Sequence, residues 1–149
     1  MAISHSFVIP LVLNPFVSYS EENPSDEREN MHPKLRHAYQ AEMTAAVDRY
    51  NTGNFQPAFT HLERAHILGQ SFPIAHTRAH WWMLKVGWKR QDVIEVFGQI
   101  PRIIGALLLS TLWVPLGNTG GARVPPFRSM PISEDLRSLL EKYGPGSNA

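Results

Sequence analysis

The chain has 149 residues, 43% of them hydrophobic and 10% aromatic, which is enough to bury the core of one globular domain. The 14 Lys and Arg and 13 Asp and Glu give a formal charge of +1, and the basic residues form no block of the kind that binds nucleic acid. Cysteine is absent, so disulfides, thiolate metal sites and cysteine nucleophiles are excluded, and a reducing compartment such as the cytoplasm is expected. Any metal ion must be held by His, Asp, Glu or amide oxygen.

The first thirty residues differ from the rest of the chain. An apolar run over residues 7–17, interrupted by prolines, is followed by a polar string. No Lys or Arg precedes Arg28, so the run lacks the positive region of a secretory signal, and it is too short to cross a bilayer as a helix. We expect a poorly ordered leader, or residues upstream of a true start at Met31. The predicted organisation is a leader over 1–30, a single helical domain over 31–143 and a tail over 144–149.

Apolar residues at three- and four-residue spacing predict a series of helices. Their expected ranges are 33–50, 54–69, 73–86, about 92 to 100, 102–113 and a last short helix over 133–143. Gly69 and Gly87 are expected to end the second and third helices, Gly69 in a left-handed conformation, and Pro101 to break or kink the fourth because proline removes a backbone donor. No strand pattern of useful length is present. The predicted fold class is therefore all-α, a compact bundle of about five helices with a Gly- and Pro-rich loop before the short last helix.

The apolar run over residues 103–116 requires separate explanation. It is shorter than the roughly 20 residues that a membrane-spanning helix needs, and it reaches Pro115. We therefore predict a buried packing helix and expect no membrane partner. The stretch that follows, over 114–132, is rich in Gly and Pro and is predicted to be a loop packed on the helices.

Two stretches carry family resemblances. GNFQPAFTHLERAHILGQSFPIAH, from Gly53, resembles a tetratricopeptide repeat, although the chain has room for about two such hairpins and a stable solenoid needs three. A second resemblance is carried by five segments: HLERAHILGQ from His61, AHTRAHWWML from Ala75, EVFGQIPRI from Glu95, VPLGNTGG from Val114 and SMPI from Ser129. Through these segments the chain resembles, over about residues 31–136, an uncharacterised bacterial family catalogued as domain of unknown function 3703. This resemblance implies a small bacterial protein and brings no established activity.

Histidine and glutamate on the predicted second and third helices have the spacing of metal ligands. His76 and His80 lie four residues apart and so share one helix face. Glu63 and His66, three residues apart, form one Glu-x-x-His element of the kind found in di-metal carboxylate bundles. Because a short turn joins the two helices, they are expected to be antiparallel, with His66 facing the other two histidines. Glu95 opens the next helix beside an apolar stripe and is a further candidate.

The leading hypothesis is one divalent transition metal, Zn, Fe, Ni or Cu, bound by His66, His76, His80 and a carboxylate from Glu63 or Glu95. Such a site would serve metal storage, sensing or metal-assisted chemistry. The turn NTGG at residues 118–121 lacks the Lys and Ser or Thr of a phosphate loop and is interpreted as a lid on the histidines.

Two metal-free alternatives remain open. In the first, the histidines are hydrogen-bonded core residues of a tetratricopeptide-like module whose partner is another protein. In the second, His76 or His80 is the acid or base of a small enzyme or ligand binder. The metal hypothesis predicts that the purified chain contains bound metal, whereas the protein-interaction hypothesis predicts that it does not.

Overall fold

A computed structural model describes residues 31–110 and 115–147. These residues form helices and loops without a strand, which confirms the all-α prediction. The predicted leader and the far end of the helix expected over 102–113 lie outside the described residues. The helices are α1 (Pro33–Asn51), α2 (Phe55–Gly69), α3 (Pro73–Lys89), α4 (Val93–Leu109) and α5 (Glu134–Tyr143).

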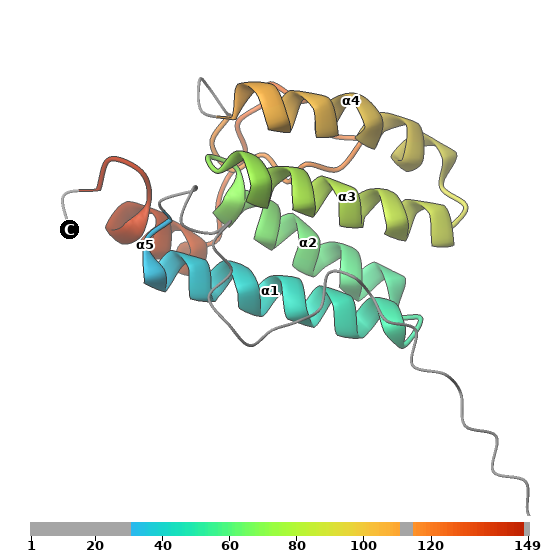
Figure 1. Ribbon diagram of the computed structural model, residues 1–149, viewed down its shortest axis with the longest axis horizontal. Coiled ribbons are helices and arrows are strands. Elements are labelled where there is room, and N and C mark those ends of the chain that lie inside the picture. Colours follow the sequence, from blue (N-terminus) through green and yellow to red (C-terminus); the bar gives the residue numbers. More distant parts are fainter. Residues whose placement is uncertain (1–30, 111–114, 148–149) are drawn as a thin grey trace, which may run out of the picture.

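The first four helices lie side by side in chain order, and each runs antiparallel to the one before it (Figure 1). The connections span only residues 52–54, 70–72 and 90–92. Because the connections are this short, consecutive helices must be neighbours in space. Helix α5 returns to contact α1 and α2 at one end of the stack. The predicted antiparallel pairing of α2 and α3 is thereby confirmed.

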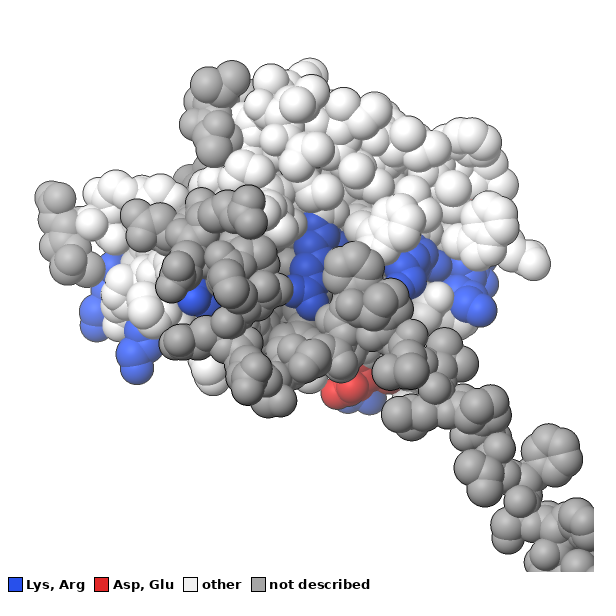
Figure 2. Space-filling model, viewed as in Figure 1, with Lys and Arg blue, Asp and Glu red and all other residues white. Residues whose placement is uncertain are grey.

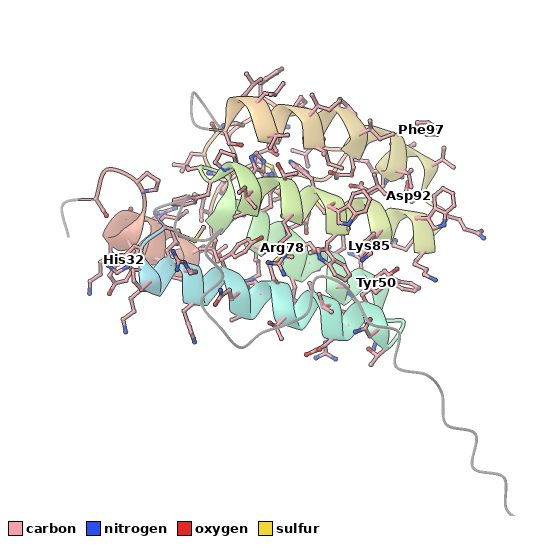
Figure 3. The ribbon with its side chains drawn as sticks, in the orientation of Figure 1. His32, Tyr50, Arg78, Lys85, Asp92 and Phe97 are labelled. Carbon is pink, nitrogen blue, oxygen red and sulfur yellow. The ribbon has the colours of Figure 1, made fainter. Side chains whose placement is uncertain are left out.

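The hydrophobic core lies between α1, α2 and α3 and is completed by α5. Tyr39 of α1 reaches across this core, and its hydroxyl donates a hydrogen bond of 3.0 Å to the carbonyl of Ala75. Towards the other end, the rings of Tyr50 and Trp82 meet edge to face, and the Lys85 ammonium lies 3.5 Å from the centre of the Trp82 ring. Figure 3 labels Tyr50 and Lys85 at this end of the core. The largest fully buried apolar side chains of this core are Leu35, Met43, Leu62, Leu68, Met83, Val86 and Leu136.

Helix α4 has the reverse of the usual amphipathic arrangement. Its polar residues Glu95 and Gln99 are buried, with exposures of 4% and 0%. Its large apolar residues point outward, and Figure 2 shows a surface over α4 that carries no charged residue in this view. A helix of a globular domain normally buries its apolar stripe. The prediction of a buried packing helix over residues 103–116 is therefore wrong for the described part of this run, whose large apolar residues are mostly exposed. The apolar side chains concerned, which are 45–68% exposed, are Val93, Ile94, Phe97, Ile100, Ile104, Leu107 and Leu108.

Three sequence predictions about helix ends need correction. Gly69 is the last residue of α2 but has no left-handed conformation, and α3 continues past Gly87 to Lys89. Both glycines instead allow close packing, since a Cβ at Gly87 would lie 3.1 Å from two side-chain carbons of Glu95. The break at Pro101 is also wrong, because α4 runs through it. The carbonyl four residues earlier belongs to Phe97 on the exposed face, where water can replace the lost bond.

No helix among the described residues combines the length and the apolar character needed to span a membrane.

We predict that Gly69→Ala destabilises the protein by about 1–3 kcal/mol. The added Cβ would lie 3.0 Å from a ring carbon of Tyr39 and 3.1 Å from the Cβ of Ala75. The ring cannot withdraw without losing its hydrogen bond to Ala75. The matched control is Gly105→Ala on α4, where a Cβ has no atom within 4 Å. That variant should be neutral or stabilised by about 0.5–1 kcal/mol. Urea unfolding followed by circular dichroism measures both, and equal effects would contradict the packing argument.

Candidate metal centre

Three histidine side chains converge between α2, α3 and α4. His66 stands near the end of α2, and His76 and His80 stand one turn apart on α3. Their Nε2 atoms are 2.7 Å (His66 to His76), 3.1 Å (His76 to His80) and 3.2 Å (His66 to His80) apart. All three residues are buried. The antiparallel pairing and the i, i+4 spacing thus bring the three nitrogen atoms to a single point.

Each imidazole is held from behind, at Nδ1, by a hydrogen-bond acceptor. His66 Nδ1 lies 2.8 Å from the backbone carbonyl of Asn118, which can only accept. His76 Nδ1 lies 2.6 Å from Ser110 Oγ, whose own proton is donated to the carbonyl of Ala106. Both bonds therefore require the proton of the imidazole to be on Nδ1.

The third imidazole has the same tautomer, because the amide of its partner has a fixed orientation. His80 Nδ1 lies 2.7 Å from Gln99 Oε1. Gln99 Nε2 lies 2.5 Å from a carboxylate oxygen of Glu95 and 2.9 Å from the carbonyl of Gly120, both of which only accept. The amide nitrogen must face these two groups, so its oxygen faces His80 and accepts the proton from Nδ1.

With all three protons on Nδ1, three Nε2 lone pairs face one another. Such an arrangement is repulsive unless a cation lies between the nitrogen atoms. Three imidazoles around a tetrahedral zinc ion, with Zn–N distances of about 2.05 Å, would have their nitrogen atoms about 3.3 Å apart. The observed separations of 2.7–3.2 Å are close to this value and slightly shorter. The cluster therefore has the ligand geometry of a three-histidine metal centre.

A proton does not fill this position at neutral pH. Burial, with added repulsion from the neighbouring imidazoles, lowers the pKa of His66 well below its ordinary value. Burial and then the charge of Arg102 lower the pKa of His76 to about 4. Burial and then the charge of His76 lower the pKa of His80 to about 3. All three imidazoles are therefore neutral at pH 7 and available as ligands.

A buried carboxylate supports the cluster from outside it. Glu95 accepts hydrogen bonds from Gln99 and, at 3.1 Å to both oxygens, from the backbone N–H of Ala122. Glu95 thereby fixes the orientation of the Gln99 amide, and Gln99 Oε1 in turn accepts the hydrogen bond from His80 Nδ1–H. Carboxylate groups placed behind a ligating histidine in this way fix its tautomer and orientation.

The loop after α4 closes the cluster, as the interpretation of the NTGG turn anticipated. Asn118 organises the loop: its side-chain nitrogen donates to the carbonyls of Pro125 (2.9 Å) and Arg128 (2.8 Å), and its side-chain oxygen accepts from Gly120 N–H (3.0 Å). Gly120 has a φ of +82°, and a Cβ there would lie 2.6 Å from the ring of His66. Only glycine satisfies both the conformation and the contact.

The structure brings together three of the five residues predicted as ligands. Glu95 and Glu63 lie outside the group of ligand atoms that approach one another within 4.8 Å. Glu95 contacts Gln99 and Ala122 instead, and Glu63 is half-buried beside Gly121, where burial and then the charge of Glu95 raise its pKa. His61, on the same helix as His66, lies outside the cluster, with its Nδ1 atom 2.7 Å from a carboxylate oxygen of Glu42.

Sequence reasoning missed the acceptors behind the histidines, which are Gln99, Ser110 and the carbonyl of Asn118. One signal was available for Gln99, because it stands where the repeat resemblance calls for a small apolar residue. Ser110 carries no comparable signal, since a serine at the end of an apolar helix is ordinary.

A cavity of about 410 Å³ opens beside the cluster, and all three imidazoles form part of its wall. The opposite wall comes from α4 and from the loop that follows it, and it is mostly apolar. Arg102 and Gln70 contribute the main polar groups apart from the cluster and its supports. Pockets of this size usually hold small molecules. The cluster is therefore reachable by a ligand from one side.

A family model described as a protein of unknown function (DUF3703) matches residues 33–140, which include the three histidines, their acceptors and the loop that closes the cluster. No curated protein and no solved structure matches the chain. Because the match covers well over half of its length, the chain belongs to the DUF3703 family of proteins of unknown function.

Proposed function

We propose that the protein binds one divalent transition metal ion through the Nε2 atoms of His66, His76 and His80. The observation that carries the proposal is the set of fixed tautomers, which turns three lone pairs towards one point. A hydrogen-bonded histidine core would instead place a proton between at least one pair of these nitrogen atoms. The metal-free interpretation leaves the convergence unexplained.

Zn²⁺ is the ion that the ligands favour. Imidazole nitrogen suits Zn²⁺, Cu²⁺ and Ni²⁺, whereas Mg²⁺ and Ca²⁺ require oxygen ligands. Non-haem iron sites commonly add a carboxylate to two histidines, and here the carboxylate of Glu95 is occupied behind Gln99. The ligand separations also fit a tetrahedral ion, and tetrahedral coordination is the usual geometry of zinc.

The cavity supports a role in which the metal acts on a small molecule. Structural zinc ions have four protein ligands, whereas catalytic ones have three and keep one position for water or substrate. Three histidines and an adjoining cavity match the second pattern. We therefore favour metal-assisted chemistry or ligand binding over storage, and a zinc-bound water at this position would have a pKa near 7.

The first prediction is that the untagged protein binds one equivalent of Zn²⁺, and that His80→Gln lowers the affinity by more than about 100-fold, the upper end of losses seen for supporting residues. Chelator competition and isothermal titration calorimetry measure the affinity. The matched control is His61→Gln, on the same helix as His66 but bonded to Glu42 outside the cluster. It should leave zinc affinity unchanged.

Circular dichroism of the metal-free variants separates loss of a ligand from loss of the fold. His80→Gln should remain helical without metal, because it removes one of three opposed lone pairs. A wild-type protein that binds none of Zn²⁺, Cu²⁺, Ni²⁺ or Fe²⁺ would sink the proposal and leave the metal-free interaction module as the better account.

The second prediction concerns how the free energy of unfolding depends on pH. The native pKa values of about 4 for His76 and about 3 for His80 lie below the ordinary 6.5 of an unfolded histidine. Between these values the unfolded state binds more protons, so the free energy of unfolding of the metal-free protein falls as pH falls below 6.5. The loss is roughly 2 kcal/mol per histidine between pH 7 and pH 5.

Urea unfolding in the presence of a chelator at pH 7, 6 and 5 measures this loss. His80→Gln should show a smaller loss than the wild type by about 2 kcal/mol, since one depressed histidine is gone. Identical slopes in the wild type and His80→Gln would mean that His80 is not held neutral by its surroundings.

A further inference from the structure

Arg102 introduces a second positive charge beside the metal centre. It projects from α4 into the cavity wall, and its Nη2 atom donates a 2.5 Å hydrogen bond to the carbonyl of Val124. No carboxylate of the described residues forms an ion pair with it within 4.0 Å. The same cavity is lined by all three histidines, so the guanidinium and the imidazoles share one wall. Among residues 31–110 and 115–147 the guanidinium is thus a half-buried cation with no direct ion-pair partner, and the charge of Glu95 acts on it only from a longer distance.

Charges in the occupied site do not balance. A divalent ion and Arg102 together carry three positive charges. The carboxylates that approach this network are Glu95 and Glu63, so an excess of positive charge remains even when both are ionised. Burial and then the charge of Glu95 raise the pKa of Glu63, which reduces its contribution further. Excess charge beside a mostly apolar cavity wall is costly, and an anion on the open side of the metal would offset it.

The other residues of the cavity wall indicate which further chemical groups the ligand carries. Gln70 is 3% exposed, lines the cavity, and its side-chain oxygen has no hydrogen-bond partner among the described residues. A buried acceptor in this state calls for a donor on the ligand. The other surface available to a ligand is apolar and comes from Pro101, Ala106, Leu109, Pro115, Pro126 and Phe127.

We propose that the cavity binds a small monocarboxylate with an apolar body. The carboxylate lies between the metal and Arg102, the apolar body packs on the prolines, Leu109 and Phe127, and Gln70 accepts a hydrogen bond from a hydroxyl or amide group of the ligand. This assignment rests on the proposed metal site, and it names the class of molecule on which that site acts. A cavity of about 410 Å³ accommodates such a molecule.

The test uses the full chain loaded with Co²⁺, whose visible absorption reports metal binding and changes when a further ligand reaches the ion. The loaded protein is titrated with acetate, hexanoate, 6-hydroxyhexanoate and inorganic phosphate. Each buried methylene is worth about fourfold in affinity, so hexanoate should bind more than about tenfold more tightly than acetate. Arg102→Gln should weaken hexanoate binding by about tenfold or more and leave Co²⁺ bound. Arg137→Gln is the matched control, since Arg137 is exposed on α5 and paired with Glu134.

The outcomes separate this inference from the metal proposal. Failure to take up Co²⁺ or Zn²⁺ would overturn the metal centre itself. Uptake of Co²⁺ with a spectrum that no carboxylate changes, or equal affinity for acetate and hexanoate, would overturn the ligand assignment alone. Phosphate binding as tight as that of hexanoate would reassign the pocket to inorganic oxyanions. An unchanged affinity in Arg102→Gln would remove Arg102 from the site.

A second, independent inference concerns the outer face of α4, defined by the seven apolar residues from Val93 to Leu108 described above. At 100° per residue, Val93, Phe97, Ile100 and Ile104 fall within a narrow sector, and Gln99 falls on the opposite side. All seven are 45–68% exposed. The face exposes on the order of 700 Å², more than the 300–600 Å² of the largest patch on a typical monomer.

We infer that this face binds a second copy of the chain. Its area is close to the roughly 800 Å² that each partner contributes to a stable interface. The face carries no charged side chain among the described residues, so it can pair with itself about a two-fold axis without placing like charges together. Ridges of Phe97, Ile100 and Ile104 from one copy would then pack between those of the other.

Analytical ultracentrifugation of the full chain at about 20 µM tests this inference. The wild type should sediment as a dimer, and Phe97→Glu with Ile104→Glu should give a monomer of unchanged helix content and metal affinity. The control is Ile74→Glu, which changes a side chain 48% exposed on α3 and should leave the dimer intact. A monomeric wild type would overturn the inference, and co-sedimentation of that monomer with phosphatidylcholine vesicles would assign the face to a lipid surface instead.

Discussion

The hydrogen bonds at the Nδ1 atoms of the three histidines are the constraint on which the rest of the site depends. The acceptors come from different elements: Asn118 from the loop, Ser110 from the end of α4, and Gln99 from its middle. If any one of them were displaced, an imidazole could rotate or change tautomer, and its lone pair would no longer reach the common point. The site therefore exists only when α2, α3, α4 and the loop are packed together.

The same constraint explains the unusual construction of α4. A helix that supplies Glu95, Gln99 and Ser110 to the interior must direct its polar stripe inward, and its apolar residues then have only the outside left to them. In an isolated chain that arrangement costs stability twice, through buried polar groups and through exposed apolar ones. Complete hydrogen bonding of Glu95 and Gln99 offsets the first cost, and pairing of the outer faces would offset the second.

The local sequence pattern was sufficient to locate the helices. It was insufficient to predict the roles of the glycines and the proline within them. The three- and four-residue period located α1 to α4 and α5 because it depends only on neighbours along one helix. Gly69 and Gly87 were interpreted as helix stops, yet they are needed because Tyr39 and Glu95 approach them from other helices. Such contacts leave no trace in the local pattern. The same holds for Pro101, which α4 tolerates because the residue deprived of its hydrogen bond faces outward.

The sequence by itself determined the fold class and the meeting of His66 with His76 and His80. One spacing of four residues and one short turn at 70–72 are local properties, and together they bring three imidazoles to one place. Only the tertiary structure decided what those imidazoles can do. Their acceptors lie 19, 34 and 52 residues away along the chain, and the inward rotation of α4 placed Glu95 behind Gln99 instead of among the ligands. Hydrogen bonds over such separations depend on how whole helices pack, which no local period specifies.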